Sequence, residues 1–181
     1  MRLSEPRIPP LGEQEWTQEQ REMLTRAQPA AAVLNVFRTL VRHTDLYKRW
    51  LPFGHQILFQ STLPPREREI LILRVGHLCN AGYEFHHHTA LGKQAGLTDE
   101  DIRAIQEGAG AARWGDLERL LLCAVDELHH DAFIGDATWQ GLASRYTTNQ
   151  LIDLVFTVGQ YTMVSMALNS FGVQLEAQKT S

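Results

Sequence analysis

Two carboxylates and a histidine in the middle of this chain have types and spacing that suit proton transfer. Glu69 follows Arg68, and Glu84 and His88 stand in the next predicted helix. Residues four apart share one face of an α-helix, so Glu84 and His88 are expected to be neighbours. An imidazole that hydrogen-bonds a carboxylate is held in one tautomer and binds its proton more tightly. With Glu69 nearby, the pair could deliver or remove a proton near neutral pH.

The spacing of Glu84 and His88 alone also fits a simpler arrangement, an ion pair on a solvated helix surface. The proton-transfer interpretation requires Glu69 to reach them from the preceding helix, which sequence spacing does not ensure. On that interpretation the three side chains share one partly enclosed pocket, and substituting the pair changes thermal stability little.

The histidine run 86–88 resembles a metal site, but its geometry argues against one. Consecutive helical residues point about 100° apart, so at most one of His86, His87 and His88 is expected to face the site. The others are expected on the surface or at an interface, and the sequence assigns His86 and His87 no role.

A di-iron site is the alternative metal hypothesis. Paired Glu-x-x-His helices, each accompanied by another helical Glu, mark di-iron carboxylate bundles. Here the two motifs are Glu84-x-x-His87 and Glu127-x-x-His130, and Glu69 and Glu22 would supply the other carboxylates. Glu-x-x-His is common by chance, so we expect no metal and no cofactor. The helix end that carries His129 and His130 is expected at a solvated or interface surface, with no role assigned.

Composition excludes several classes of function. The 181 residues carry a net charge of −4 with no long basic run, so we expect no nucleic-acid partner. Two cysteines, Cys79 and Cys123, provide no disulfide framework and favour a reducing compartment. The first residues lack an apolar signal core, and the apolar segment 151–168 is interrupted by polar residues, which favours a buried helix over a membrane span. We expect a cytoplasmic protein without a membrane partner.

Helical periodicity predicts an all-α fold in a single domain, 1–181. Residues 1–29 would form an N-terminal extension, 30–107 the core and 116–175 the C-terminal helices. The glycine-rich loop 108–115 could separate two subdomains. Expected boundaries are Thr17 with a Gln20 capping box, Pro29 as a helix start, Pro52 as a kink or fresh start, Pro64 and Pro65 launching the next helix, Gly82 as a break, Gly96 and Gly108 as helix ends, and Asp136 and Thr148 as N-caps.

Three further side chains are candidates for the substrate pocket. Tyr83 precedes Glu84, and Gln160 and Tyr161 interrupt an otherwise apolar helix. Polar groups in such a position either line a pocket or are satisfied at a subunit interface, and the sequence favours neither.

Three segments, 63–74, 83–88 and 95–100, resemble the carboxymuconolactone decarboxylase family, which includes the alkylhydroperoxidase D-like proteins. The resemblance rests on Glu69, on Tyr83-Glu84-Phe85 followed by His88, and on Ala95-Gly96-Leu97, and it covers roughly residues 34–105. It implies an all-α, alkylhydroperoxidase D-like helical bundle and a homo-oligomer, commonly a trimer or a hexamer. It places the site at Glu69 and His88.

The chain departs from the family's peroxidase pattern at both cysteines. Peroxidase members carry Cys-x-x-Cys four residues before the histidine, and those positions are Ala81 and Glu84 here. Thiol peroxidase chemistry needs an attacking thiolate and a resolving thiol within reach. Cys79 is therefore better interpreted as a small apolar residue.

These observations favour cofactor-free acid–base chemistry on a small carbonyl or lactone compound, as in a carboxymuconolactone decarboxylase-like lyase. Decarboxylation of a lactone acid needs a conjugated carbonyl to accept electrons and an acid to protonate the dienolate. Glu84 or His88 could be that acid. An antioxidant peroxidase of the alkylhydroperoxidase or peroxiredoxin type is one alternative. A non-catalytic helical scaffold or small-molecule binder is the other, and the substrate itself is not encoded by the fold.

Overall fold

The computed structural model describes residues 1–26 and 32–177, and this part of the chain contains helices and no strand. The all-α prediction is confirmed. The elements in chain order are η1 (Glu13–Glu15), α1 (Gln18–Arg26), α2 (Asn35–Leu40), α3 (Thr44–Phe59), α4 (Pro65–Leu78), α5 (Gly82–Gln94), α6 (Asp99–Glu107), α7 (Asp116–Asp131), α8 (Asp136–Ala143) and α9 (Thr148–Phe171).

Helix α4 lies at the centre of the fold and packs against α5, α6, α7 and α9. Every residue from Glu69 to Gly76 is buried, as expected for a helix enclosed on all sides. Each large apolar side chain buried there contributes about 1.5–3 kcal/mol. The helix begins at Pro65, whose missing N–H costs nothing in a first turn. Because α4 is enclosed, a carboxylate on it, such as Glu69, must find its partners inside the protein.

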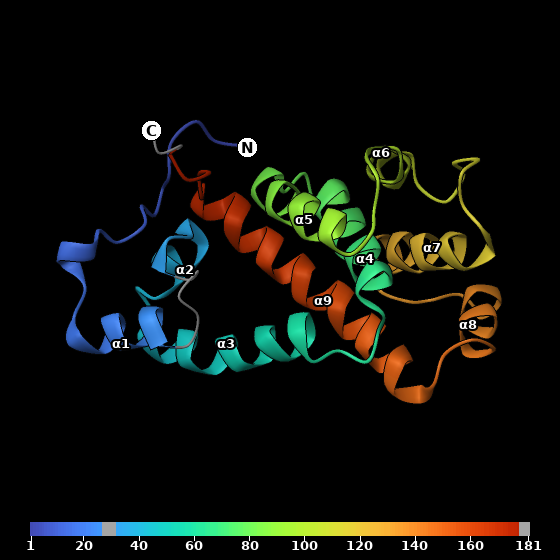
Figure 1. Cartoon of the computed structure of the whole chain (residues 1–181), viewed down its shortest axis with the longest axis horizontal. Coiled ribbons are helices and arrows are strands. Elements are labelled where there is room, and N and C mark those ends of the chain that lie inside the picture. The colour runs from blue at the N-terminus through green and yellow to red at the C-terminus, as the bar shows by residue number, and fades with distance from the viewer. Residues whose placement is uncertain (27–31, 178–181) are drawn as a thin grey trace.

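Helix α9 crosses the molecule diagonally, with α3 on one side and α4 and α5 on the other (Figure 1). It is the helix among the described residues whose length and composition could span a membrane, and half of its most apolar window is buried inside the structure. It also packs against α7 and α8, as a core helix does. Its exposed positions still include Ile152, Phe156, Met163 and Met166.

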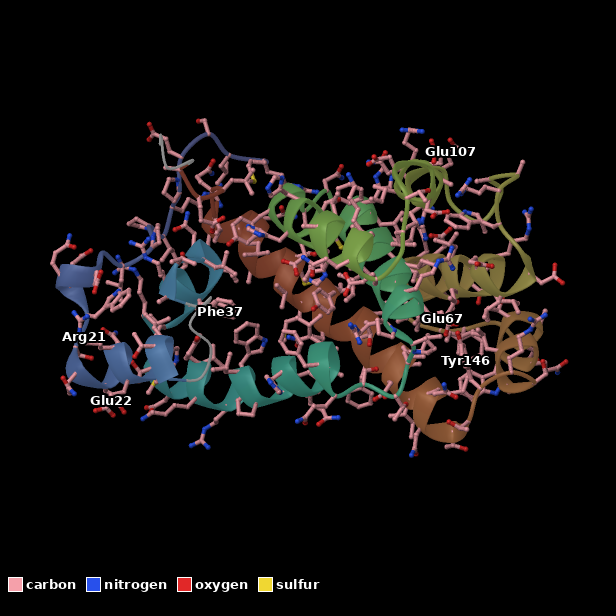
Figure 2. All side chains as sticks on the ribbon, in the orientation of Figure 1. Arg21, Glu22, Phe37, Glu67, Glu107 and Tyr146 are labelled. Atoms are coloured by element: carbon pink, nitrogen blue, oxygen red, sulfur yellow. The ribbon has the colours of Figure 1, made fainter. Side chains whose placement is uncertain are left out.

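The largest buried core draws on both sides of the 108–115 loop, since Ile70 and Ile105 pack in one cluster with Leu121 and Leu154. The turn before α9 is tied to α4 by a hydrogen bond of 2.6 Å from Tyr146 Oη to Glu67 Oε2, and Figure 2 labels both residues. A smaller cluster joins α2, α5 and the end of α9. It forms the side of the fold on which the candidate site lies.

Several predicted boundaries match the structure, and others shift. Thr17 and Gln20 exchange capping hydrogen bonds, Gly82 begins α5, and Gly96 and Gly108 follow helix ends. The predicted N-caps Asp136 and Thr148 were each one residue late, because Gly135 and Thr147 hold those positions. Thr147 accepts from Gln150 N, which fixes the start of α9. Pro29 lies outside the described residues.

Pro52 does not begin a new helix, since α3 continues through it from Thr44 to Phe59. A proline deprives the carbonyl four residues earlier of its partner. Here Pro52 and Lys48 both lie on the exposed side, where water can satisfy that carbonyl. The exposed side of α3 also carries Leu46 and Phe53.

Candidate active site

His88 lies between two glutamates in the interior of the protein. Its Nδ1 is 2.7 Å from Glu69 Oε2, and its Nε2 is 3.2 Å from Glu84 Oε1. The exposed fractions of Glu69, Glu84 and His88 are 1%, 7% and 5%. The structure therefore brings together the three residues singled out in the sequence, and it replaces the solvated surface pair with a buried one.

The close approach of α5 to α4 is what brings Glu69 to His88. Gly92 lies one turn beyond His88 on the same face of α5. A Cβ added at Gly92 would lie 2.9 Å from Leu97 Cδ1, 3.2 Å from Leu73 Cδ1 and 3.8 Å from Glu69 Cβ. A side chain at this position would require Leu97 and Leu73 to shift, so the glycine leaves room for the close packing of α5 against α4.

The surroundings of His88 favour its charged form. Burial alone would lower its pKa, but the hydrogen bonds to Glu69 and then Glu84, together with their negative charges, raise the pKa to about 9. His88 is therefore an imidazolium at neutral pH; its Nδ1–H donates to Glu69, and its Nε2 lies at ion-pair distance from Glu84. Arg68 lies behind this group, with its Nε 3.7 Å from Glu69 Oε1.

Glu84 and His88 form part of the wall of a cavity of about 250 Å³, whereas Glu69 does not reach it. The other walls come mainly from α2, α3 and α9. Phe37 of α2, labelled in Figure 2, packs against Trp50 of α3 with ring centroids 6.2 Å apart. The apolar lining comprises Leu34, Val36, Phe37, Trp50, Leu51, Gly54, Leu58, Phe59, Leu91 and Val164. The site thus combines a buried proton-binding pair with an apolar chamber.

Gln160 and Tyr161 both line this cavity. The Tyr161 ring stands edge-on to His88, with centroids 4.9 Å apart and an interplanar angle of 83°. Burial raises the pKa of Tyr161 well above its ordinary value, and the charges of Glu84 and Glu69 act in the same direction. Gln160 is 5% exposed, and its Oε1 has no hydrogen-bond partner among the described residues.

Tyr83 contributes its ring to the cavity wall, but its hydroxyl is committed elsewhere. Tyr83 Oη donates to Glu176 Oε1 at 2.7 Å and accepts from Val36 N at 3.2 Å. Burial, and next the bond to Glu176, raise its pKa above the ordinary value. Tyr83 therefore shapes the pocket while its hydroxyl connects α5 to the C-terminal segment.

Sequence reasoning missed Glu176, which joins three parts of the cavity rim. Its Oε1 accepts from Asn35 N at 2.7 Å as well as from Tyr83, and its Oε2 lies 2.9 Å from His87 Nε2. The His87 contact has the distance of an ion pair but not the alignment of a hydrogen bond. Glu176 follows the end of α9 at Gly172, where no helical periodicity remains, so the sequence carried no signal for it.

The positions of the three consecutive histidines correct the expectation that at most one of them faces the site. His86 is exposed and His88 is buried, but His87 also lines the cavity. Two of the three histidines therefore reach the site, since α5 presents adjoining faces to α4 and to the cavity.

The second motif of the di-iron hypothesis, Glu127 and His130, has its own local partners. Glu127 caps α8, accepting from Gly135 N at 2.8 Å and from Thr138 Oγ1 at 2.6 Å. His130 Nδ1 lies 2.7 Å from the carbonyl oxygen of Asp126 in its own helix. Within the described ranges, no group of three or more His, Cys, Asp or Glu side chains has an arrangement that could hold a metal ion.

Neither cysteine lines the cavity. Cys79 ends α4, with its Sγ 3.9 Å from His129 Nδ1. Burial raises the pKa of the Cys79 thiol, as it does for Cys123. Both thiols are therefore held in the less nucleophilic, protonated form at neutral pH.

Comparison with a family model confirms the resemblance. The sequence model of the carboxymuconolactone decarboxylase family matches residues 44–127, and this span includes Glu69, Glu84 and His88. The match covers less than half of the 181 residues, so it shows that this segment is similar to the family. No curated protein sequence matches the chain.

Solved structures share the alkylhydroperoxidase D-like fold. An uncharacterized peroxidase-related protein from Ralstonia eutropha JMP134, described as an alkylhydroperoxidase AhpD core, has a TM-score of 0.82 at 16% identity, covering 96% of this chain and 93% of its own. An uncharacterized peroxidase-related protein from Silicibacter sp. TM1040 has a TM-score of 0.77 at 17% identity, covering 97% of this chain and 92% of its own. A protein of unknown function from Agrobacterium tumefaciens, associated in its description with the antioxidant defence protein AhpD, has a TM-score of 0.70 at 15% identity. The match covers 77% of this chain and 97% of that protein.

Proposed function

We propose that this protein is a cofactor-free acid–base enzyme that moves a proton on a small carbonyl or lactone compound. The observation that supports this most is the buried Glu69–His88–Glu84 group, two members of which reach an apolar cavity. Ionisable groups that are buried, coupled and open to a cavity are typical of proton-transfer sites.

Each residue has a distinct part in this proposal. Glu84 takes a proton from the carbon next to the carbonyl, the C–H electron pair becomes a C=C bond, and the carbonyl π electrons move to oxygen. Return of a proton to the carbon restores the carbonyl. His88, protonated at neutral pH, holds Glu84 in place and can exchange protons with it. Glu69 does not line the cavity and acts as a positioning residue that orients the His88 ring.

Peroxide reduction is the activity that the neighbours' names suggest, but the local chemistry does not favour it. The positions that carry cysteines in peroxidase relatives are Ala81 and Glu84, and the two cysteines present lie outside the cavity. The proposed reaction therefore uses no thiol.

Hydrogen exchange tests the proposal without requiring the natural substrate. The protein is incubated in D₂O with small ketones and lactones, and loss of the α-proton signal is followed by NMR. We expect protein-dependent exchange that falls about a hundredfold or more in Glu84→Gln, the usual scale for a general acid or base. The surface variant Glu100→Gln on α6 is the control and should keep the full rate.

Coupling between the two cavity residues gives a second readout. A Glu84→Gln/His88→Gln double variant should lose little beyond the worse single variant, because groups that act as one unit are non-additive. If ligands bind to the folded protein and none undergoes exchange, the protein is a small-molecule binder and the catalytic proposal fails.

We also propose that the protein forms a homo-oligomer. Large apolar side chains are exposed along α9 and the adjoining face of α3, where Phe53 and Phe156 contact each other with centroids 6.1 Å apart. Exposed apolar patches of this kind are characteristic of interaction surfaces. A trimer or hexamer would agree with the family resemblance.

A further inference from the structure

The polarity of the cavity is unevenly distributed. One wall carries the carboxylate of Glu84 and the imidazolium of His88, and the remaining walls are almost entirely aliphatic and aromatic. A ligand must therefore place most of its surface against apolar side chains and direct its reactive group at a single wall.

This cavity lacks a fixed positive charge for an acidic ligand. Among the side chains of residues 1–25 and 32–177, no Lys or Arg lines it. Arg68 lies against Glu69, and neither residue lines the cavity. His88 is already shared by two carboxylates, and His87 is close to Glu176. His55 also lines the cavity but is exposed, so water screens its interactions.

A carboxylate in this cavity would lose its hydration without gaining a counter-ion and would face Glu84. Burying an unpaired charge is among the largest penalties in binding, and like charges at close range add to it. An uncharged ligand avoids both costs. The cavity should therefore bind neutral carbonyl compounds more tightly than their acid analogues. A substrate of decarboxylation must carry a carboxyl group, so it falls among the disfavoured acids.

Gln160 adds a specific polar requirement. Gln160 lines the cavity, and its buried Oε1 has no hydrogen-bond partner among the described residues. An unsatisfied buried acceptor is costly. A ligand that donates a hydrogen bond there would satisfy it. Gln160 arises from α9, whereas Glu84 and His88 arise from α5, so one ligand could be held by both helices.

We propose that the cavity binds an uncharged, largely apolar carbonyl compound that carries one hydrogen-bond donor, with Gln160 accepting from that donor. An apolar cavity of about 150 Å³ holds benzene, so about 250 Å³ accommodates a substituted ring. This inference rests on the proposed proton-transfer function for the carbonyl group, and it names the substrate class of that site.

Three matched probes test the inference by direct binding to the full-length protein at pH 7. They are 4-(hydroxymethyl)acetophenone, which is neutral with a donor, 4-ethylacetophenone, which lacks the donor, and 4-acetylbenzoic acid, which is charged. Dissociation constants are measured by titration calorimetry and ligand-observed NMR. We expect the hydroxymethyl ketone to bind best and the acid to bind at least about tenfold more weakly than either ketone.

Variants assign these preferences to residues. Gln160→Met keeps the size of the side chain and should weaken the hydroxymethyl ketone several-fold while leaving 4-ethylacetophenone within twofold. Glu84→Gln should strengthen the acid relative to both ketones. Gln56→Met, on the exposed side of α3, is the matched control and should change nothing. Circular dichroism confirms that each variant is folded.

Three results would overturn the inference: equal or tighter binding of the acid, an equal effect of Gln160→Met on both ketones, or no binding of any probe at millimolar concentration. Deuterium exchange is measured separately on the same samples. Tight binding of the acid with exchange intact would reject the substrate class and leave the catalytic proposal standing. Selective binding of the hydroxymethyl ketone without exchange would reject the catalytic proposal and leave the ligand class standing.

Discussion

Raising the pH should destabilise this protein through His88 in particular. The pKa of His88 is about 9 in the folded state, compared with 6.5 for a histidine without these contacts. Each pKa unit corresponds to about 1.4 kcal/mol, so protonation of His88 is linked to about 3 kcal/mol of folding free energy. Because the folded-state pKa is raised, this stabilisation is fully present below pH 6.5 and is lost as the pH rises through about 9.

The assay is urea unfolding of the wild type and His88→Gln at several pH values from 6 to 9.5. The free energy of unfolding of the wild type should fall by about 3 kcal/mol more than that of the variant over this range. Stopping at 9.5 limits the contribution of the buried tyrosines, such as Tyr47 with its pKa of about 12. His86→Gln, an exposed position on the same helix, is the matched control and should follow the wild type.

The same reasoning changes the expected effect of substitution at neutral pH. The proton-transfer interpretation of the sequence implied that replacing the pair would alter stability little or even raise it. With Glu69 1% exposed, His88→Gln leaves a buried carboxylate without its main partner, and such losses cost about 3–5 kcal/mol. The variant should therefore be clearly less stable at pH 7, with the difference shrinking by pH 9.5. Parallel pH profiles for the wild type and the variant would refute the buried, charged His88.

Three further outcomes are expected. Gly92→Ala should lower the free energy of unfolding by about 1–3 kcal/mol, because the new methyl group would contact Leu97 and Leu73. Gly159 in α9 has open space around it, so Gly159→Ala should leave stability unchanged or raise it by up to about 1 kcal/mol. Denaturant midpoints compare the two, and equal effects would contradict the close helix packing. Thiol-dependent turnover of an alkyl hydroperoxide should be absent in a coupled assay, and a robust rate abolished by Cys79→Ser would show that Cys79 had been misjudged. Light scattering should report an oligomer at micromolar concentration, and a well-behaved monomer would reject the proposed assembly.

Local sequence signals located many helix boundaries. Thr17 and Gln20 form the predicted reciprocal capping box at α1. Such bonds span three residues, so they depend on the local backbone and can be predicted from residue types. The prediction at Thr148 missed by one residue because the adjacent Thr147 can cap equally well, whereas at α8 Gly135 occupies the N-cap position without a side-chain hydrogen bond.

The sequence by itself determined which chemistry was available: the four-residue spacing of Glu84 and His88 makes them neighbours in any helix. Their burial, the approach of Glu69, the cavity walls from α2 and α3 and the position of Glu176 were decided by tertiary packing. These contacts join segments far apart in the chain, so no periodicity records them. The charge of His88 belongs to this second group, because a pKa depends on desolvation and on partners that only the folded interior brings within reach.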